Sequence, residues 1–412
     1  MSTEEPLASV TQTGCIVVGG GPGGMVLAFL LARAGVNVTL LESHLDFDRD
    51  FRGDTVHPST LELMDDLGLA ERLLQIPHGH IRVMRLATPE RVYDLADFRR
   101  VKTKFPYIMM LPQAKFLDFL AKEAAQFPCF HLVLGANVQR LVQENGAVVG
   151  VRYRDIDNRW HEVRAPLTVA ADGRHSKIRA LAGLEPEKTA PPMDVMWLRV
   201  PKPPGESFDE GSVTIAGGQF LVTLNRGDEW QLGYVFLKGG FQQLRAQGIE
   251  ALRGHIADVA PIFRDRLEKS LTDWKQCTLL SVESSRLKTW YQPGLLFIGD
   301  AAHVMSPVGG VGINYAIQDA VEAANRLSQP LKKGQVTLAD LKAVQDRREW
   351  PVKVIQRVQG VIQKRIVAAG LRSDRPFRLP LPMRVLTSLP GFRRLMPTLF
   401  GWGVRPARLA KS

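Results

Sequence analysis

The sequence predicts an α/β protein in which a parallel-sheet domain carries an inserted antiparallel-sheet domain and is followed by a helical C-terminal region. Three observations support this prediction. Buried strands lead into helices at residues 15–42, 167–181 and 293–327. Strand-like runs rich in Val, Leu, Phe and Trp fill residues 195–237. Helical periodicity continues from residue 329 to about residue 371, and a basic, proline-broken tail follows.

The glycine-rich turn near the start of the chain predicts a dinucleotide site. Gly19, Gly21 and Gly24 stand in GxGxxG spacing between a short apolar strand and a helical run at residues 25–34. The first glycine permits a tight turn, the second lets backbone approach a pyrophosphate, and the third lets helix pack on strand. The unpaired N–H groups of the helix attract phosphate. Glu42 ends the next strand, 23 residues after Gly19, where its carboxylate can accept from a ribose hydroxyl. These features predict a Rossmann-like domain.

A second strand–loop–helix stretch predicts a site at the carboxyl edge of the same sheet. The buried strand at residues 295–298 ends in Gly299 and Asp300, and this carboxylate can accept hydrogen bonds from a polyol. The glycine-rich loop to Asn314 suits backbone that lies against a flat ring. The helix beginning at Ile313 would stabilise negative charge on that ring through its dipole. The alternative is an ordinary connection with a capping aspartate.

Asp172 follows a third buried strand, at residues 167–171, and precedes a basic helix. Asp-Gly is a common turn dipeptide and by itself indicates a simple turn, whereas a strand that leads into a basic helix favours a cofactor-facing turn.

Composition narrows the classes of function. At 412 residues the chain is expected to form two domains, and 45% hydrophobic with 23% charged residues is typical of a globular protein. Three cysteines without a CxxC pair indicate reduced thiols rather than disulfides or a metal site. The acidic N-terminus does not resemble a signal peptide, and no apolar run is long enough to span a membrane. We therefore expect a cytoplasmic protein.

The formal charge of +11 is concentrated at the C-terminal end. Residues 361–412 hold eleven Lys or Arg and one acid, Asp374, while the rest is nearly neutral. No nucleic-acid-binding motif is present, so nucleic acid is not an expected partner. The apolar residues of the tail, among its arginines, fit contact with a membrane surface or a partner protein. They also fit packing against the body of the protein, with the arginines in solvent.

The antiparallel sheet offers aromatic candidates for a substrate pocket. Trp197 and Tyr234 lie in its strand-like runs, and Tyr107 precedes it. Each is either a pocket residue or an ordinary aromatic core residue.

Taken together, three fingerprints resemble the FAD-dependent aromatic hydroxylases, which are single-component flavoprotein monooxygenases with the p-hydroxybenzoate hydroxylase fold. They are GGGPGG at residues 19–24, ADGRHSKIR at 171–179 and GDAAHVMSPVGGVGIN at 299–314. The resemblance implies an FAD-binding domain from residues 10–80, 101–188 and 282–330, and a substrate domain from residues 81–100 and 189–281. Residues 331–412 form the helical C-terminal region with its basic, apolar tail.

The resemblance also implies which residues bind FAD. Glu42 would hold the adenosine ribose, Asp172 would lie near the pyrophosphate, and Asp300 would bind the ribityl chain. Arg52 and Gln113 would contact the cofactor, and the loop before Asn314 would flank the isoalloxazine. The implied cofactor-binding residues are Gly19, Gly21, Pro22, Gly23, Gly24, Glu42, Arg52, Gln113, Asp172, Gly299, Asp300, Pro307, Gly310, Gly312, Ile313 and Asn314.

The implied reaction assigns no catalytic side chain, because the flavin carries the chemistry. NADPH or NADH would reduce FAD, dioxygen would form a flavin hydroperoxide, and a hydrophobic aromatic, polyketide-like or quinone-like substrate would be hydroxylated or epoxidised. Arg174, His175 and Arg179 could meet the nicotinamide phosphates, although a solvated basic helix explains them as well. Two alternatives are a reductase of the geranylgeranyl-reductase type and a non-catalytic flavoprotein that binds a hydrophobic ligand.

Overall fold

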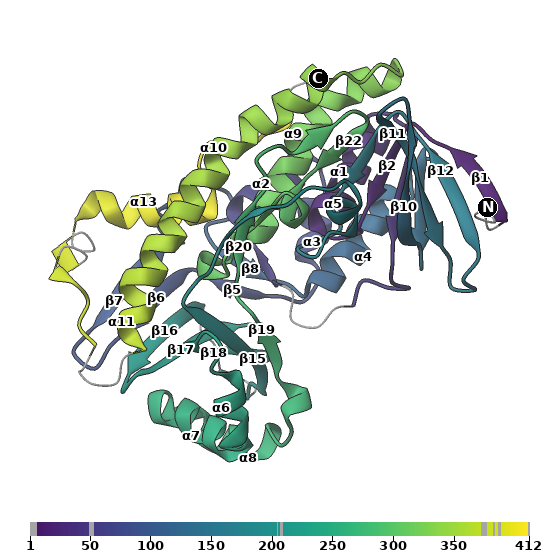
Figure 1. The fold of residues 1–412 in the computed structure, drawn as a ribbon. Helices are drawn as coiled ribbons and strands as arrows, with labels where there is room; N and C mark the ends of the chain where they lie inside the picture. Colours follow the sequence, from purple (N-terminus) through teal and green to yellow (C-terminus); the bar gives the residue numbers. More distant parts are fainter. Residues whose placement is uncertain are drawn as a thin grey trace.

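A computed structural model describes residues 6–48, 53–203, 205–206, 209–371, 377–381, 384–385 and 389–410. Figure 1 shows a parallel sheet with its helices at the top, a second sheet below it, and a long helix that runs between the two. The predicted α/β class with an antiparallel-sheet insertion is confirmed.

The upper domain is built on a six-stranded sheet in the order β21-β22-β13-β2-β3-β9. Its strands are parallel except for the edge strand β21, and helices α1, α4 and α9 cover it. The strands are β2 (Cys15–Val18), β3 (Val38–Glu42), β9 (Phe130–Leu134), β13 (Thr168–Ala170), β21 (Tyr291–Gln292) and β22 (Leu295–Phe297). The helices are α1 (Pro22–Arg33), α4 (Gln113–Ala124) and α9 (Gly312–Lys332). Because parallel strands end at one edge, the turns after β2, β13 and β22 meet there.

A four-stranded sheet flanks this domain in the order β1-β12-β11-β10. Its strands are β1 (Leu7–Gln12), β10 (Asn137–Glu144), β11 (Ala147–Arg154) and β12 (Trp160–Arg164). Strands β11 and β12 pair antiparallel and form a hairpin around Asp155–Asn158. Smaller elements join this upper body: β4 (Thr55–Val56), α2 (Pro58–Asp66), α3 (Ala70–Leu74), β5 (Gly79–Ile81), β8 (Ile108–Met110), α5 (Lys177–Leu181), β14 (Glu187–Thr189), β20 (Ser284–Arg286) and β23 (His303–Val304).

The lower domain is a seven-stranded sheet in the order β19-β15-β18-β17-β16-β6-β7. Its strands are β6 (Val83–Ala87), β7 (Val92–Asp97), β15 (Met193–Pro201), β16 (Glu210–Ala216), β17 (Gln219–Asn225), β18 (Glu229–Leu237) and β19 (Thr278–Leu280). Helices α6 (Phe241–Ala246), α7 (Ile249–Val259) and α8 (Arg264–Ser270) lie on one face of this sheet (Figure 1). The early strands β6 and β7 thus join strands from residues 193–280. The predicted domain boundaries remain a prediction.

The C-terminal region returns to the body of the protein. It contains α10 (Leu338–Ile362), a π-helical turn (Gln363–Val367), α11 (Ala368–Gly370) and α13 (Pro390–Gly401). The Gln318 side-chain amide donates to the Trp402 carbonyl at 3.0 Å, and Asn325 bonds the backbone of Arg408 and Ala410. The described end of the tail therefore packs on α9, as one of the two interpretations of its sequence expected. Within the described residues, no helix combines the length and apolarity needed to cross a membrane.

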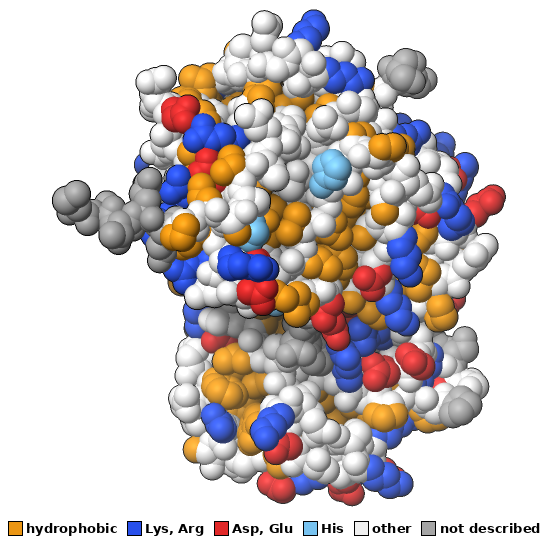
Figure 2. Space-filling model, turned by 90° about the vertical axis from the view of Figure 1, so that its right-hand side faces the viewer, with side chains coloured by type: hydrophobic (Ala, Val, Ile, Leu, Met, Phe, Trp, Pro, Cys, Tyr) orange, Lys and Arg blue, Asp and Glu red, His pale blue; other side chains and the backbone are white. Residues whose placement is uncertain are grey.

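Short 3₁₀ turns complete the fold at Phe98–Arg100, Pro261–Phe263, Trp274–Gln276, Gly299–Ala301 and Val308–Gly310. On the face shown in Figure 2, acidic and basic side chains are interspersed and do not form a uniform basic surface.

Candidate functional site

A cavity of about 1190 Å³ lies between the six-stranded sheet and the seven-stranded sheet. Its upper wall contains the turns after β2, β13 and β22, together with the start of α9. Its lower wall is the face of the seven-stranded sheet opposite the helices α6–α8. The cavity thus joins the predicted cofactor residues to the predicted substrate domain.

The glycine turn forms one end of the upper wall. Gly19 has φ +104°, and a Cβ there would lie 2.5 Å from the Ala171 carbonyl oxygen. A Cβ on Gly24 would lie 2.0 Å from the Gly19 oxygen, so this glycine lets α1 pack against β2 without lining the cavity. Gly21 has open space around it and lines the cavity beside Pro22 and Gly23. No side chain caps the N-terminus of α1, so its first N–H groups remain available to a phosphate.

Glu42 lies at the end of β3, next to this turn. It is buried to 8% exposure and lines the cavity, and its Oε2 accepts from the Gly20 N–H at 2.8 Å. Its Oε1 accepts from the His44 N–H at 3.0 Å. These contacts fix the carboxylate at the cavity wall, beside the glycine turn.

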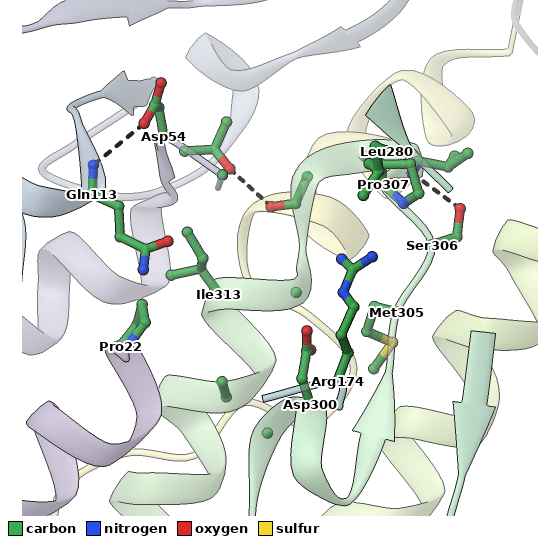
Figure 3. A pocket seen from close by; sticks show the side chains of 18 of the residues that line it. Pro22, Asp54, Gln113, Arg174, Leu280, Asp300, Met305, Ser306, Pro307 and Ile313 are labelled. Carbon is green, nitrogen blue, oxygen red and sulfur yellow. Dashed lines mark hydrogen bonds between the residues drawn. The ribbon is translucent and has the colours of Figure 1, made fainter. Parts of the chain in front are cut away.

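Gln113, at the start of α4, points toward Pro22 and Ile313 in Figure 3 and lines the cavity. Its backbone N–H donates to Asp54 Oδ1 at 3.3 Å. Asp54 also forms a 2.7 Å ion pair with Arg226 of the lower sheet, so one buried carboxylate connects the two domains. Burial raises the pKa of Asp54, although Arg226 opposes the shift. Arg52 lies outside the described residues.

Asp172 lines the cavity after β13. Burial raises the pKa of Asp172, while the Ser176 hydroxyl and the Ile178 N–H, both donating to its carboxylate, oppose that rise. The same turn carries Arg174, which lines the cavity and whose side chain extends between Asp300 and Met305 in the view of Figure 3. The turn after β13 therefore places the carboxylate of Asp172 and the guanidinium of Arg174 on the same wall of the cavity.

The Gly299–Asp300 turn is held by a buried charged network. The Gly299 N–H donates to Asp319 Oδ2 at 3.0 Å, and this carboxylate also contacts His303 Nε2 at 2.6 Å and Arg348 Nε at 2.8 Å. Burial alone would raise the pKa of Asp319, but the adjacent His303 and Arg348 hold it below its usual value. Asp319 thereby anchors the turn that presents Asp300 to the cavity.

The loop before α9 provides a narrow strip of backbone along the cavity. Gly309 and Gly310 have positive φ, and the Thr55 hydroxyl donates to the Gly310 carbonyl at 2.9 Å. The predicted residues that line the cavity here are Gly299, Asp300, Pro307, Gly310, Gly312 and Ile313. Asn314 does not line it: this side chain is 2% exposed, and its Oδ1 accepts from the Thr60 hydroxyl at 2.7 Å. Its geometry indicates that it supports the loop.

Of the three aromatic candidates, only Trp197 lines the cavity, and Tyr107 is buried in the core of the parallel-sheet domain. Tyr234 lies on the other face of the sheet, in the core shared with α6–α8, where its hydroxyl contacts Gln219 and His255. The expectation for Tyr234 is therefore corrected. Side chains alternate along a strand, so Tyr234 on β18 points away from the face that carries Trp197.

The cavity also contains residues that the sequence did not indicate. Phe400 and Met396 of α13, and Val354, Arg357 and Val358 of α10, line it. Phe400 lies directly over Gly309, where a Cβ would come within 2.3 Å of its ring. Gln231 of the lower sheet also faces the cavity. No local motif marks these positions, because they reach the cavity only through packing of distant elements.

These residues fit FAD. The open backbone at Gly21 accommodates a pyrophosphate, the Glu42 carboxylate suits a ribose, and Asp300 suits a polyol. The strip at Gly310 and Gly312, where a Cβ on Gly312 would meet only Met305 at 3.8 Å, leaves room for a flat ring.

Comparisons with known proteins agree with this geometry. Residues 12–358 match the family described as an FAD binding domain. The chain is 33% identical over 393 residues to 6-methylpretetramide 4-monooxygenase of Streptomyces rimosus, covering 95% of this chain and 93% of that protein. It is 26% identical over 384 residues to protoasukamycin 4-monooxygenase of Streptomyces nodosus subsp. asukaensis, covering 87% and 89%.

Solved structures show the same fold. The p-nitrophenol 4-monooxygenase of Pseudomonas putida superposes with a TM-score of 0.72 at 18% identity, covering 95% of this chain and 94% of that one. A probable FAD-dependent monooxygenase of Pseudomonas aeruginosa gives a TM-score of 0.74 at 19% identity, covering 86% and 96%. This chain therefore belongs to the FAD binding domain family, among the FAD-dependent aromatic hydroxylases, and is an FAD-dependent monooxygenase.

Proposed function

We propose that this monooxygenase hydroxylates a flat, fused-ring aromatic substrate of polyketide type, with NADPH or NADH as electron donor. The observation that carries this proposal is the lining of the lower wall. Sixteen residues of the seven-stranded sheet line the cavity, and fourteen are apolar: Met84, Leu86, Leu95, Ala96, Met193, Val195, Trp197, Val213, Phe220, Val222, Leu224, Val235, Leu279 and Leu280, with Gln231 and Thr278 as the polar pair. Such a wall favours burial of an extended hydrophobic molecule. The name of the Streptomyces rimosus relative supports the same substrate class.

The chain contributes position and exclusion of water to the reaction. When bound, FAD accepts reducing equivalents from the nicotinamide and activates dioxygen for transfer to the substrate. The backbone strip at Gly310 and Gly312 would orient the flavin ring, and the start of α9 would place its positive dipole end beside that ring. The apolar lower wall holds the substrate opposite this strip. Phe400 and Met396 cover a further side and keep water away from the reacting atoms.

The electron donor is proposed to dock at the turn after β13. Arg174, His175 and Lys177 line the cavity there and offer positive charge to its phosphates. The single glycine fingerprint is assigned to FAD, so the nicotinamide would bind transiently without a Rossmann domain of its own.

The test uses the purified, FAD-loaded protein. We expect NADPH or NADH oxidation that is stimulated by fused-ring phenols and accompanied by dioxygen uptake, with one atom of ¹⁸O₂ in the product. Nicotinamide oxidation without dioxygen uptake, together with a saturated product, would instead identify a reductase. FAD binding without any stimulated oxidation would identify a non-catalytic flavoprotein.

Peripheral membrane contact is a separate proposal for the C-terminal tail. It is supported by the exposure of Leu381, Val385, Leu389 and Leu395 close to arginines of the same segment. Sedimentation with vesicles of phosphatidylcholine and phosphatidylglycerol should carry the protein down. A protein that remains in the supernatant at low salt would contradict this contact.

A further inference from the structure

Strand β18 presents two different surfaces to its two sides. Trp230, Leu232, Tyr234 and Phe236 belong to the core shared with α6–α8. Gln231 and Val235 line the cavity on the other face. Gly233 lies between these two positions in the same alternation, so the cavity floor has no side chain at this point of β18.

Trp197 of β15 fills that gap. It is the direct cross-strand partner of Gly233. A Cβ on Gly233 would lie 2.8 Å from Trp197 Cζ3, 3.0 Å from Cη2 and 3.1 Å from Cε3. If the indole pointed its edge at Gly233, Cη2 and Cε3 would lie much farther from the added Cβ than Cζ3, the atom between them. The near-equal distances therefore show that a face of the six-membered ring covers Gly233, so that Trp197 lies flat on the sheet.

Gln231 is the polar neighbour of this flat indole. Its side chain is buried to 6% exposure and lines the cavity. Its Oε1 is itself buried and has no hydrogen-bond partner among the described residues, so a molecule in the cavity reaches this oxygen only when the amide rotates toward it. Its cross-strand neighbours in the sheet are Arg199 of β15 and Leu224 of β17. A buried amide oxygen without a partner is unfavourable unless a ligand or an ordered water supplies a donor.

We propose that Trp197, lying on Gly233, and the amide of Gln231 together form the recognition floor for the substrate. The indole stacks a fused aromatic ring system, and Gln231 accepts a hydrogen bond from a hydroxyl group on that ring system. Gln231, Gly233 and Trp197 are thus specificity-determining residues for a planar phenol of more than one ring. This inference rests on the proposed function and adds the chemical group that the enzyme recognises.

The first experiment tests the hydrogen bond. FAD-loaded wild-type, Gln231→Met and Gln242→Met proteins are titrated with 2-hydroxyanthracene and with anthracene, and binding is followed by the change in the flavin absorption spectrum. Methionine preserves the length of the side chain and removes the amide. We expect Gln231→Met to weaken the binding of 2-hydroxyanthracene about tenfold and to leave the binding of anthracene nearly unchanged. Gln242 is exposed on α6, so its variant should match wild type.

The second experiment tests the stacking surface. Gly233→Ala places a methyl group against the indole face and should displace Trp197 into the cavity, and Trp197→Leu removes the ring. Both changes should weaken the binding of 2-hydroxyanthracene about tenfold. They should weaken the binding of phenol, which has a single ring, much less. Trp350 is 55% exposed on α10, so Trp350→Leu serves as the matched control. FAD content and thermal unfolding identify any variant that misfolds. If Gly233→Ala misfolds, Trp197→Leu alone tests the stacking surface.

The outcomes separate this inference from the proposed function. Equal weakening of the hydroxylated and plain probes by Gln231→Met would overturn the hydrogen bond. Retention of 2-hydroxyanthracene affinity in Trp197→Leu, or failure of the FAD-loaded wild type to bind that probe, would overturn the stacking floor. In either case stimulated dioxygen uptake with other aromatic substrates would leave the proposed function standing. Loss of all stimulated uptake in the wild type would remove the proposed function itself.

Discussion

His57 is fully buried where α2 begins, and it connects that helix to the C-terminal helix α13. Its Nδ1 lies 2.7 Å from the Phe400 carbonyl oxygen. A carbonyl only accepts, so Nδ1 carries the proton and donates. Burial lowers the pKa of His57 from 6.5 to about 4, although the carbonyls of Phe400 and Gly310 oppose this shift. The folded protein therefore holds a neutral imidazole at neutral pH.

This histidine makes stability depend on pH. The unfolded chain binds a proton on His57 below pH 6.5, whereas the folded chain does not until about pH 4, so stability falls as the pH drops through this window. Between pH 7 and pH 5 we expect a loss of about 2 kcal/mol from this residue. His57→Asn, which keeps a donor without titrating, should lose correspondingly less. Urea unfolding at the two pH values measures the difference, and an equal loss in both proteins would contradict the assignment.

Glu42 offers a test of the cofactor site at a single carboxylate. Glu42→Gln keeps the size of the side chain but removes the charge that strengthens a hydrogen bond from a ribose hydroxyl. We expect the FAD dissociation constant to rise about tenfold or more, measured by titrating apoprotein with FAD and following flavin fluorescence. The exposed Glu71 of α3 provides the control, and Glu71→Gln should bind FAD as wild type does. Unchanged affinity in Glu42→Gln would remove Glu42 from the site.

Residue types alone could not decide which aromatic residue faces the cavity. Trp197 and Tyr234 both stand in apolar strands, and Tyr234 is buried on the opposite side of the sheet. Alternation along a strand divides its residues into two faces, but it does not say which face a distant helix covers. Here α6–α8 cover one face, and this decides the role of each residue. Gln231 went unnoticed for the same reason.

At the scale of elements, the turn between β2 and α1 contains glycines with two different roles, one in packing and one in leaving space for a ligand. A Cβ on Gly24 would come within 2.0 Å of the Gly19 oxygen, whereas a Cβ on Gly21 would meet nothing within 4 Å. Gly24 is therefore required by the contact between helix and strand. Gly21 is required only by a molecule that occupies the cavity.

This difference predicts opposite results for two alanine variants. Gly24→Ala should destabilise the protein by about 3 kcal/mol or more, because backbone must move to admit the methyl group. Gly21→Ala should unfold near the wild-type temperature and yet bind FAD much more weakly, because its methyl group fills the space for the pyrophosphate. Thermal unfolding of the apoproteins and FAD titration measure the two effects. Wild-type FAD affinity in Gly21→Ala would contradict the placement of the pyrophosphate.

Local patterns predicted the elements of the cofactor domain well. The strands that lead to Gly19, Asp172 and Asp300 were recognised because short apolar runs end in characteristic glycine or acidic turns. The strand β1 was not recognised, since Leu7–Gln12 is mostly exposed, mixes apolar and polar residues without a clear pattern and is ordered by pairing with β12. The early strands β6 and β7 were assigned to the substrate domain only through a family resemblance. Their pairing in the seven-stranded sheet depends on contacts far apart in the sequence.

At the scale of the whole molecule, the cavity is assembled from three parts of the chain. The parallel-sheet domain supplies the cofactor wall, the seven-stranded sheet supplies the opposite wall, and α10 and α13 cover a further side. Figure 1 shows α10 running from the upper body toward the lower sheet, with α13 beside β6 and β7. The buried ion pair between Asp54 and Arg226 joins the two walls at 2.7 Å. The enclosure that the reaction needs is thus a property of the complete fold.

The role of α13 in this enclosure can be tested with one substitution on each of its sides. Phe400 lines the cavity and lies on Gly309, whereas Leu395 on the same helix is 58% exposed. Phe400→Ala should open a path for water beside the reacting atoms, so that a larger part of the consumed nicotinamide yields hydrogen peroxide instead of hydroxylated product. We expect this part to rise several-fold, while Leu395→Ala remains at the wild-type value. Measuring peroxide and product per NADPH consumed decides the matter, because equal coupling in the two variants would show that α13 does not seal the cavity.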